Sequence, residues 1–465
     1  MVKGIGTLAL CALMGWATMA AHAEERQVTF SAKNHELDNN DNFSPDGKLL
    51  CYDTRETVGP GIDNGQTIEV VEIGTGKETV LYQPEVSVTG ERPAPGIGAA
   101  SFCPAAAKVA FIHGPPVATL PERGPYGKPN RTGMEVQASA DALAAGAGFS
   151  HSWLDHRDIA TDRDTLPGAH RGGTHRHEYS RECNRIGFTY DDFLLPRYGR
   201  TIGYMEPHAE APGDATHYFA LLVRVTPADE AQPGDFITAL GDSWVDAQGR
   251  MRAFIGTVRG ARGDAQSLFV ADIPDSVDIT TADAGGPDRF PAPPEGVVIR
   301  RLTHGYAAGI VRGAPDGTRI AYFGHDSEGH SQVFLIPADG SDRSDDPAKR
   351  PVQVTAFEHG TEAGLRWHPG GKSIVCQSDG GVAAVCADPA DERFGETVWL
   401  TPHGDGKERY AAVVSPDGAL VAYNLAVPAA DAGGNRLTNY AGLDFSQIFT
   451  VPFPDTDGDG VAEAG

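Results

Sequence analysis

A short strand-turn-strand pattern recurs seven times along the chain, and it limits the folds that this sequence can adopt. The clearest copy, Phe43 to Tyr52, has an apolar strand end, a Ser-Pro-Asp-Gly turn and the start of a returning apolar strand. The other copies, some of them degenerate, are Phe102 to Phe111, Tyr179 to Phe188, Asp246 to Phe254, Gly313 to Tyr322, Trp367 to Cys376 and Val414 to Tyr423. Such a repeat indicates one small structural unit that is stacked many times.

Further strand-like segments lie between these copies. They are Thr67 to Ile73, Ser267 to Ile273, Gln332 to Ile336 and Gln447 to Val451, and several are followed by a short segment that ends in Leu-Thr or Val-Thr, namely Arg300 to Thr303, Val352 to Thr355 and Val398 to Thr401. Four short antiparallel strands per unit, repeated seven times, predict an all-β fold, a seven-bladed β-propeller. A β-sandwich is the main alternative.

The two ends of the propeller are expected to meet in one blade. Gln27-Val28-Thr29 resembles the fourth-strand endings and predicts a strand beside Gln447 to Val451, which would close the ring and remove two open sheet edges. We therefore assign the propeller to residues 24–454. Residues 115–168, which are rich in Pro, Gly and Ala, are expected to be an irregular insertion over one face of the ring.

The segments outside the propeller predict export and an acidic tail. Residues 1–23 resemble a secretory signal peptide, because Lys3 precedes an apolar run and Ala21-His22-Ala23 resembles a cleavage site. No later apolar run reaches the length of a membrane span, so a periplasmic or secreted protein is expected. Residues 455–465 begin like a calcium loop, but the chain stops before the required glutamate, which favours a plain acidic tail.

Net charge and cysteines restrict the partners. A formal charge of -25 argues against nucleic acid as a partner, and an anionic glycan would need a locally basic cleft. The five cysteines after residue 23 are an odd number without a metal-type Cys-x-x-Cys pair. Most are expected to be buried thiols, and a bridge between Cys376 and Cys386 is the alternative.

Residues 170–200 form a cationic stretch in this acidic chain. They hold six arginines, three histidines and four acids. These side chains are either solvated loop residues that pair with the acids, or they converge on an anionic substrate.

Propeller topology favours convergence on one face of the ring. In a blade, the loops that follow the second and fourth strands and precede the first strand share a face, here called the working face. His113 and Tyr190 end the second strands of two neighbouring blades, and Arg200 follows ten residues after Tyr190. His175 and His177 begin a first strand with the period-two spacing that directs both to one side, as in a metal-ligand pair. The alternatives are that His113 caps its strand and that Tyr190 is a half-buried strand aromatic.

A histidine, a tyrosine and an arginine together suit β-elimination on a uronic acid. The arginine binds the sugar carboxylate, and the imidazole or a deprotonated phenol takes the neighbouring proton, while a second such group protonates the departing oxygen. The paired carboxylates of a glycosidase are unnecessary for this reaction. The absence of a Gly-x-Ser-x-Gly elbow argues against a propeller-bearing peptidase.

Four motifs carry a resemblance to a known group of proteins. They are Phe111 to Pro115, Arg171 to His177, Phe188 to Asp192 and Gly296 to Thr303. With these motifs the chain resembles bacterial seven-bladed propeller proteins of unknown function, a group that is similar to the ulvan lyases.

The resemblance implies roles for individual residues. His113 and Tyr190 would be the acid/base pair, and Arg200 would neutralise the carboxylate. Asn130 stands where such lyases carry a second histidine, and with Arg171 and Arg197 it is expected to contact substrate. A structural zinc is implied for some of these enzymes. Zinc or calcium is therefore expected here too, with His175 and His177 as its candidate ligands.

The sequence thus predicts an exported, monomeric polysaccharide lyase that acts on an anionic, uronate-containing and ulvan-like glycan. The alternative is a non-catalytic propeller that resembles the TolB-like periplasmic proteins and binds a partner through the same face.

Overall fold

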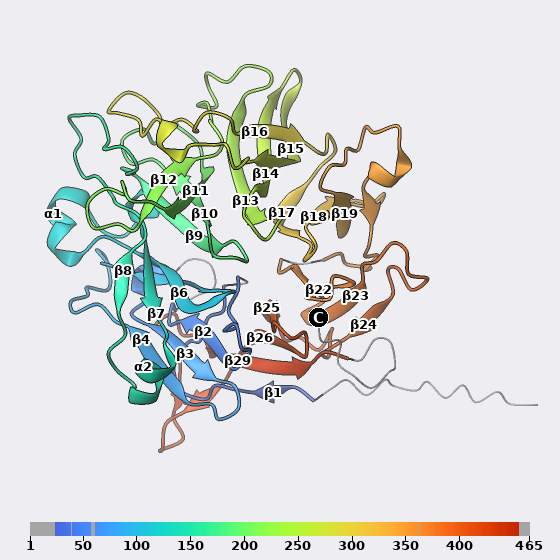
Figure 1. The fold of residues 1–465 in the computed structure, drawn as a ribbon. Coiled ribbons are helices and arrows are strands. Elements are labelled where there is room, and N and C mark those ends of the chain that lie inside the picture. The colour runs from blue at the N-terminus through green and yellow to red at the C-terminus, as the bar shows by residue number, and fades with distance from the viewer. Residues whose placement is uncertain (1–23, 39, 57–60, 362, 455–465) are drawn as a thin grey trace, which may run out of the picture.

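Seven antiparallel sheets are arranged around a central axis in the computed structural model, which describes residues 24–38, 40–56, 61–361 and 363–454 (Figure 1). The predicted all-β, seven-bladed propeller is confirmed. A sandwich would stack two sheets face to face, whereas here each sheet packs its two faces against neighbouring sheets of the ring. The predicted signal peptide and acidic tail lie outside the described residues.

Blades one to four follow each other in chain order. Blade one contains β2 (Leu49–Asp53), β3 (Ile68–Glu72) and β4 (Glu78–Tyr82), and its innermost segment pairs with β2 only through the isolated bridges Glu36–Asp53 and Phe43–Leu50. Blade two contains β5 (Ile97–Cys103), β6 (Ala106–His113), β7 (Thr132–Gln137) and β8 (His151–Trp153). Blade three contains β9 (Gly173–Tyr179), β10 (Ile186–Asp191), β11 (Thr201–Pro207) and β12 (His217–Leu221). Blade four contains β13 (Phe236–Trp244), β14 (Met251–Gly260), β15 (Gly263–Asp272) and β16 (Val298–Arg301).

Blades five to seven complete the ring. Blade five contains β17 (Ala308–Gly313), β18 (Arg319–His325), β19 (Ser331–Pro337) and β20 (Val352–Gln353). Blade six contains β21 (Arg366–Trp367), β22 (Ser373–Ser378), β23 (Gly381–Cys386) and β24 (Thr397–Trp399). Blade seven contains β25 (Arg409–Val414), β26 (Leu420–Val427), β29 (Phe445–Pro452) and β1 (Arg26–Gln27), and a small hairpin of β27 (Ala429–Ala430) and β28 (Arg436–Leu437) projects from it.

The repeated turn joins the first and second strands of a blade. In blade one the Ser44 amide donates to the carbonyl of Leu49 over 2.9 Å, and the Gly47 amide donates to the carbonyl of Ser44 over 2.8 Å. The Ser44 hydroxyl also donates to Asp46 Oδ1 over 2.7 Å. Gly47 has a φ of +70°, which glycine adopts without strain. These turns therefore mark one face of the disc, here called the turn face, and the working face lies at the other end of the strands.

The predicted ring closure is confirmed. β1 pairs antiparallel with β29, with Arg26 opposite Thr450 and Gln27 opposite Phe449. The amide of Val28 continues this ladder by donating to the carbonyl of Ile448 over 2.8 Å. In Figure 1 the blue β1 lies beside the red β29, so that one blade is built from both ends of the described chain.

The expected irregular insertion is partly wrong, because it supplies half of blade two. β7 and β8 within residues 115–168 are the third and fourth strands of that blade. The sequence did not predict these two strands, because the segments that flank them are rich in Gly and Pro. The rest of the insertion holds α1 (Leu120–Arg123) and α2 (Ala140–Ala145) with the short turns η2 (Val117–Thr119) and η3 (Lys128–Asn130); further turns elsewhere are η1 (Ile62–Asn64), η4 (Ile279–Thr281) and η5 (Pro347–Lys349). Among the described helices, none has the length and apolar character to cross a bilayer.

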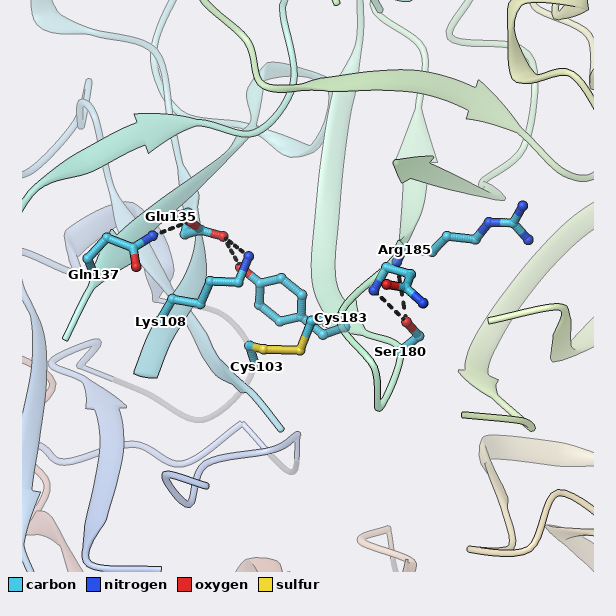
Figure 2. The surroundings of a disulfide bond; sticks show 9 residues. Cys103, Lys108, Glu135, Gln137, Ser180, Cys183 and Arg185 are labelled. Carbon is cyan, nitrogen blue, oxygen red and sulfur yellow. Dashed lines mark hydrogen bonds and ion pairs between the residues drawn. A yellow bond between two sulfur atoms is a disulfide. The ribbon is translucent and has the colours of Figure 1, made fainter. Parts of the chain in front are cut away.

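A disulfide between Cys103 and Cys183 links blades two and three near the turn face (Figure 2). The sequence did not predict this pairing. Cys376 and Cys386 are free thiols on neighbouring strands, and the alternative of a bridge between them is wrong. The strand register explains this, since Cys376 lies opposite Ala383 and Cys386 lies opposite Ser373. The bridge therefore connects two blades rather than two strands of one blade.

Replacing Cys103 and Cys183 by serine is expected to lower the free energy of unfolding by about 2–4 kcal/mol. The two cysteines are 80 residues apart in sequence, so the bridge restricts a long loop of the unfolded chain. Chemical denaturation of the double variant and of the wild type measures the difference. Replacing the free thiol Cys386 by serine is the control. Equal stability of the double variant and the wild type would contradict a formed bridge.

Candidate functional site

His113, at the end of β6, is buried and already hydrogen-bonded. The residue is only 4% exposed, and its Nδ1 lies 2.7 Å from the carbonyl oxygen of Gly114. The rings of Tyr82 and Trp153 contact the imidazole edge-on. Burial, with the charge of Arg157 as a smaller contribution, lowers the pKa of His113 to about 4. His113 is therefore neutral near pH 7 and faces blade one and the outer strand of blade two.

Tyr190, near the end of β10, is fully buried. Its hydroxyl donates to Asp192 Oδ2 over 3.0 Å, and its ring packs against Phe219. Burial and the Asp192 carboxylate raise the pKa of Tyr190 well above its usual value. The phenol therefore stays protonated, and its hydroxyl is engaged in a hydrogen bond within the fold.

Arg200 precedes β11 and is half-buried. Its Nε and Nη2 both donate to Asp191 Oδ2, at 2.9 and 2.6 Å. Asp191 follows Tyr190 directly on β10, and consecutive strand residues point to opposite faces of a sheet. The structure thus places His113, Tyr190 and Arg200 at the same end of blades two and three but does not bring their side chains together.

The three predicted substrate contacts have structural partners. Asn130 Nδ2 donates to the carbonyls of Arg123 and Pro125 over 2.8 and 2.9 Å, which holds the loop after α1. Arg171 is 1% exposed and pairs with Asp192 over 3.0 Å. Only Arg197 is well exposed among them; it lies 3.2 Å from a carboxylate oxygen of Asp229 and 2.7 Å from one of Glu230.

His175 and His177 do not point to one side, contrary to the expectation from their spacing. Arg176 between them has a φ of +59°, and the β9–β10 register shifts at this point. The bulge turns His177 toward blade two, where Nε2 lies 3.0 Å from Thr174 Oγ1, whereas His175 Nδ1 lies 3.5 Å from Thr189 Oγ1. In the described ranges no three His, Cys, Asp or Glu side chains are grouped to hold a metal ion. A metal pair at these histidines stays a prediction.

Arg131 lies at the working-face end of blade two, and the sequence did not single it out as a site residue. It follows η3, and its carbonyl accepts from the amide of Thr174, which joins blade two to blade three over 3.2 Å. Its guanidinium stacks on Tyr126, at 5.0 Å from the ring centre. No carboxylate of the described residues lies within ion-pair distance of it, and its Nε is buried without a hydrogen-bond partner.

Arg131, His175 and Arg200 influence one another electrostatically. Burial, then the charges of Arg131 and Arg200, lower the pKa of His175 well below its usual value. Burial also lowers the pKa of Arg131, and the charge of Arg200 contributes. These three residues, here called the rim cluster, place two cations beside a neutral imidazole at the boundary of blades two and three.

A cavity of about 350 Å³ opens at the turn face, where the central channel ends. Five prolines of the repeated turns line its mouth, namely Pro45, Pro104, Pro315, Pro369 and Pro416. Deeper residues include Glu178, Arg312 and Arg366. Glu178 Oε2 lies 2.9 Å from Nη1 of the buried Arg252. Because the prolines of the repeated turns line this cavity, it lies at the end of the ring opposite the working face.

Fold and strand order define the chain as a seven-bladed β-propeller. Residues 96–208, which include the rim cluster, match a family described as a protein of unknown function, DUF3748. The chain is 29% identical over 428 residues to the uncharacterized protein YidR of Escherichia coli (strain K12), covering 86% of this chain and 94% of that protein.

Several solved propellers are similar in shape alone. Polysaccharide lyase Uly1 superposes with a TM-score of 0.46 and 9% identity, covering 87% of this chain and 88% of that one. A putative TolB from Agrobacterium tumefaciens gives 0.36 and 13%, covering 84% and 98%. TolB from Acinetobacter baumannii gives 0.38 and 11%, covering 87% and 79%. Likeness at this level assigns no activity to this chain.

Proposed function

We propose that the protein is a polysaccharide lyase that cleaves a uronate-containing, ulvan-like glycan by β-elimination at the rim cluster. The observation that supports this most is the backbone placement of the three residues. The carbonyl of Arg131 accepts from the amide of Thr174, next to His175, and Arg200 precedes the strand that pairs with β10 beside His175. On a chain with a net charge of -25, such a site has a clear use in binding an anion.

The two arginines would bind the uronate carboxylate. Arg131 has no ion-pair partner among the described residues. Arg200 donates to Asp191 Oδ2 through one edge of its guanidinium, which consists of Nε and Nη2. Charge-assisted hydrogen bonds from both would favour the negative charge that develops when the neighbouring carbon loses its proton. Their role is therefore carboxylate binding and charge stabilisation.

His175 would move the proton. The neutral imidazole accepts the proton from the carbon next to the carboxylate, and the electron pair of that C–H bond forms a carbon–carbon double bond. The bond to the departing glycosidic oxygen breaks, and the imidazolium returns its proton to that oxygen. No water is consumed. A positioned proton transfer of this kind typically contributes ~10²–10⁴ in rate.

The acid/base roles of His113 and Tyr190 stay predictions. For either residue to serve the reaction, its side chain must leave the contacts with Gly114 or Asp192. Replacing Tyr190 by phenylalanine and His113 by alanine separates these assignments from the one at His175. The structural zinc or calcium also stays a prediction.

A non-catalytic, TolB-like binding propeller is the second candidate. One observation favours it, because the proton-transfer groups predicted from the sequence are engaged inside the fold. In this case the same rim would bind an anionic partner without cleaving it.

Export to the periplasm or medium is part of the proposal. The signal-like segment of residues 1–23 supports it, and so does the bridge between Cys103 and Cys183, because disulfides persist mainly in oxidising compartments. Cell fractionation that finds the protein in the cytoplasm with reduced cysteines would contradict export.

The test of the activity is the formation of an unsaturated uronate. Purified protein is incubated with ulvan and other uronate polymers, and the ultraviolet absorbance of the new double bond is followed. A neutral glucan is the matched control polymer. We expect absorbance to grow with a uronate polymer only. Saturable binding of that polymer without any product would favour the binding propeller instead.

A further inference from the structure

The first strands of five blades carry the same irregularity. In each of them one residue has a positive φ, and the register with the second strand shifts beside it; these residues are Ala99, Arg176, Gly241, Gly309 and Ala411. A bulge of this kind bends a strand and redirects a side chain. Four of these blades place alanine or glycine at the bulge, whereas blade three places an arginine with a φ of +59°. Among these five blades, blade three alone therefore presents a long side chain at this level.

The side chain of Arg176 lies in the central channel. Its Nη2 donates to Oδ1 of the buried Asn40 over 3.1 Å. Asn40 belongs to the innermost segment of blade one, so the guanidinium extends from blade three past the first strand of blade two. Arg176 is partly exposed, but it does not line the cavity at the turn face. Solvent therefore reaches it from the working face, where the neighbouring His175 belongs to the rim cluster.

Two nitrogens of this guanidinium are accessible and without a partner. Nε and Nη1 of Arg176 reach solvent and make no hydrogen bond to the described residues. No carboxylate of the described chain lies within ion-pair distance of them, although the protein has a net charge of -25. A positive φ is uncommon for an arginine, and such conformations occur preferentially at functional sites. Together these observations indicate that a ligand uses the charge of Arg176.

The neighbouring charges restrict the ligand. Burial and the repulsion of nearby charges, Arg176 among them, lower the pKa of both Arg312 and Arg366. The carboxylates of Glu178 and Asp41 act in the opposite direction on these two arginines. Three guanidiniums thus stand against two carboxylates in this part of the channel. A ligand with one negative charge offsets the excess, whereas the two carboxylates would repel a more highly charged anion.

We infer that the central channel binds one small monoanionic oxyanion group, a carboxylate or a sulfate ester, through Nε and Nη1 of Arg176. The group enters from the working face. Hydrogen bonds from a guanidinium to such oxygens are charge-assisted and short. This binding requires no elimination at the rim cluster, so it is tested separately from the proposed lyase activity.

Titration with small probes tests the site. Acetate, methyl sulfate and the uncharged acetamide are each added to the purified protein, and calorimetry is recorded at low ionic strength because salt screens such contacts. We expect saturable binding of at least one charged probe, at least about tenfold tighter than that of acetamide. Binding of acetate alone would assign a carboxylate, and binding of methyl sulfate alone a sulfate ester. Equal binding of acetate and acetamide without binding of methyl sulfate, or binding of none of the probes, would overturn the inference.

Arg176→Gly separates a ligand-binding role from a structural one. Glycine adopts a positive φ without strain, as Gly241 and Gly309 do in blades four and five. We expect this variant to melt at a temperature no lower than that of the wild type and to bind the charged probes at least about tenfold more weakly. Arg250→Gln, which removes an arginine from an exposed ion pair with Asp275, is the control and should leave binding unchanged.

Binding is the deciding readout of these variants. Unchanged binding by Arg176→Gly would overturn the inference, and a lower melting temperature with unchanged binding would show that Arg176 only braces Asn40. If the glycine variant does not fold, Arg176→Gln serves instead, because it keeps a polar side chain but removes the charge. That variant should also bind the charged probes at least about tenfold more weakly, and wild-type binding by it would contradict the site.

Discussion

Replacing Glu178 by glutamine is expected to lower the free energy of unfolding by about 1.5–3 kcal/mol, because it removes one of the two carboxylates, Glu178 and Asp242, that hold the buried guanidinium of Arg252. Glu178 lies on the innermost strand of blade three and is 6% exposed. Its carboxylate is 2.9 Å from Arg252 Nη1 and 3.6 Å from Arg312 Nη1, so it joins blade three to blades four and five across the channel.

Denaturant unfolding of Glu178→Gln and of wild type measures this effect. Ser243→Ala is the matched control, because it removes only the hydroxyl that donates to Glu178 Oε1 over 2.7 Å. We expect that variant to lose about 1 kcal/mol. A Glu178→Gln variant that is no less stable than Ser243→Ala would show that the ionic contacts are not required.

The same carboxylate predicts a loss of stability in acid. Burial alone would raise the pKa of Glu178, but the charges of Arg252 and Arg312 outweigh it and lower the pKa below that of an ordinary glutamate. A group whose pKa is lower in the folded state stabilises the fold above its unfolded pKa, and this contribution disappears as the pH falls through the folded pKa. Wild type should therefore lose stability below about pH 4.5 more steeply than Glu178→Gln does.

Replacing Arg131 by glutamine is expected to lower kcat/KM on a uronate polymer by about 10²–10³, if the rim cluster carries the elimination. Glutamine keeps part of the side-chain volume, but it loses the guanidinium that stacks on Tyr126 and the charge that would stabilise the developing anion. Arg131→Lys should retain part of the activity. Steady-state kinetics on the polymer, with melting temperatures as a check of folding, give the comparison.

The control for this experiment is Arg436→Gln. Arg436 lies on the small β27–β28 hairpin of blade seven, outside blades two and three, and forms an exposed ion pair with Asp444. We expect this variant to keep wild-type activity. Full activity of Arg131→Gln would remove Arg131 from the site, whereas equal losses in both variants would point to a general effect of charge.

The repeat carried most of the information about the fold. The Pro-Asp-Gly turns predicted seven blades, and Gln27 to Thr29 predicted the blade shared by both ends, because turn chemistry and edge pairing are local. β7 and β8 were missed, since their Gly- and Pro-rich flanks resemble an irregular loop. The bridge between Cys103 and Cys183 depends on the packing of two blades, which sequence spacing does not report.

The catalytic, substrate-binding and metal-binding roles inferred from the sequence stay predictions, and the structure defines only the contacts of these residues. The ends of β6 and β10 do lie at one end of the ring, yet the period of two places Tyr190 and Asp191 on opposite faces of blade three and so separates Tyr190 from Arg200. The bulge at Arg176 likewise separates His175 from His177. Such contacts depend on single backbone angles, which the residue pattern alone does not reveal.

The repeat also contains a signal for the charged channel that our prediction from the sequence did not use. Glu178, Arg312 and Arg366 each stand immediately before a copy of the repeated pattern, at the channel end of three first strands. The other four copies have an uncharged residue at this position, namely Asn42, Ser101, Val245 and Val413, so the three charged residues indicate a charged channel. Aligning the copies by this position would have predicted it.

The most direct test of the lyase proposal is mass spectrometry of products formed from ulvan in water enriched in heavy oxygen. Elimination breaks the glycosidic bond without adding water, so we predict fragments that end in an unsaturated uronate and incorporate no heavy oxygen. Fragments that carry heavy oxygen at a saturated end would show hydrolysis and contradict the proposal, as would an intact polymer after incubation with folded wild-type protein.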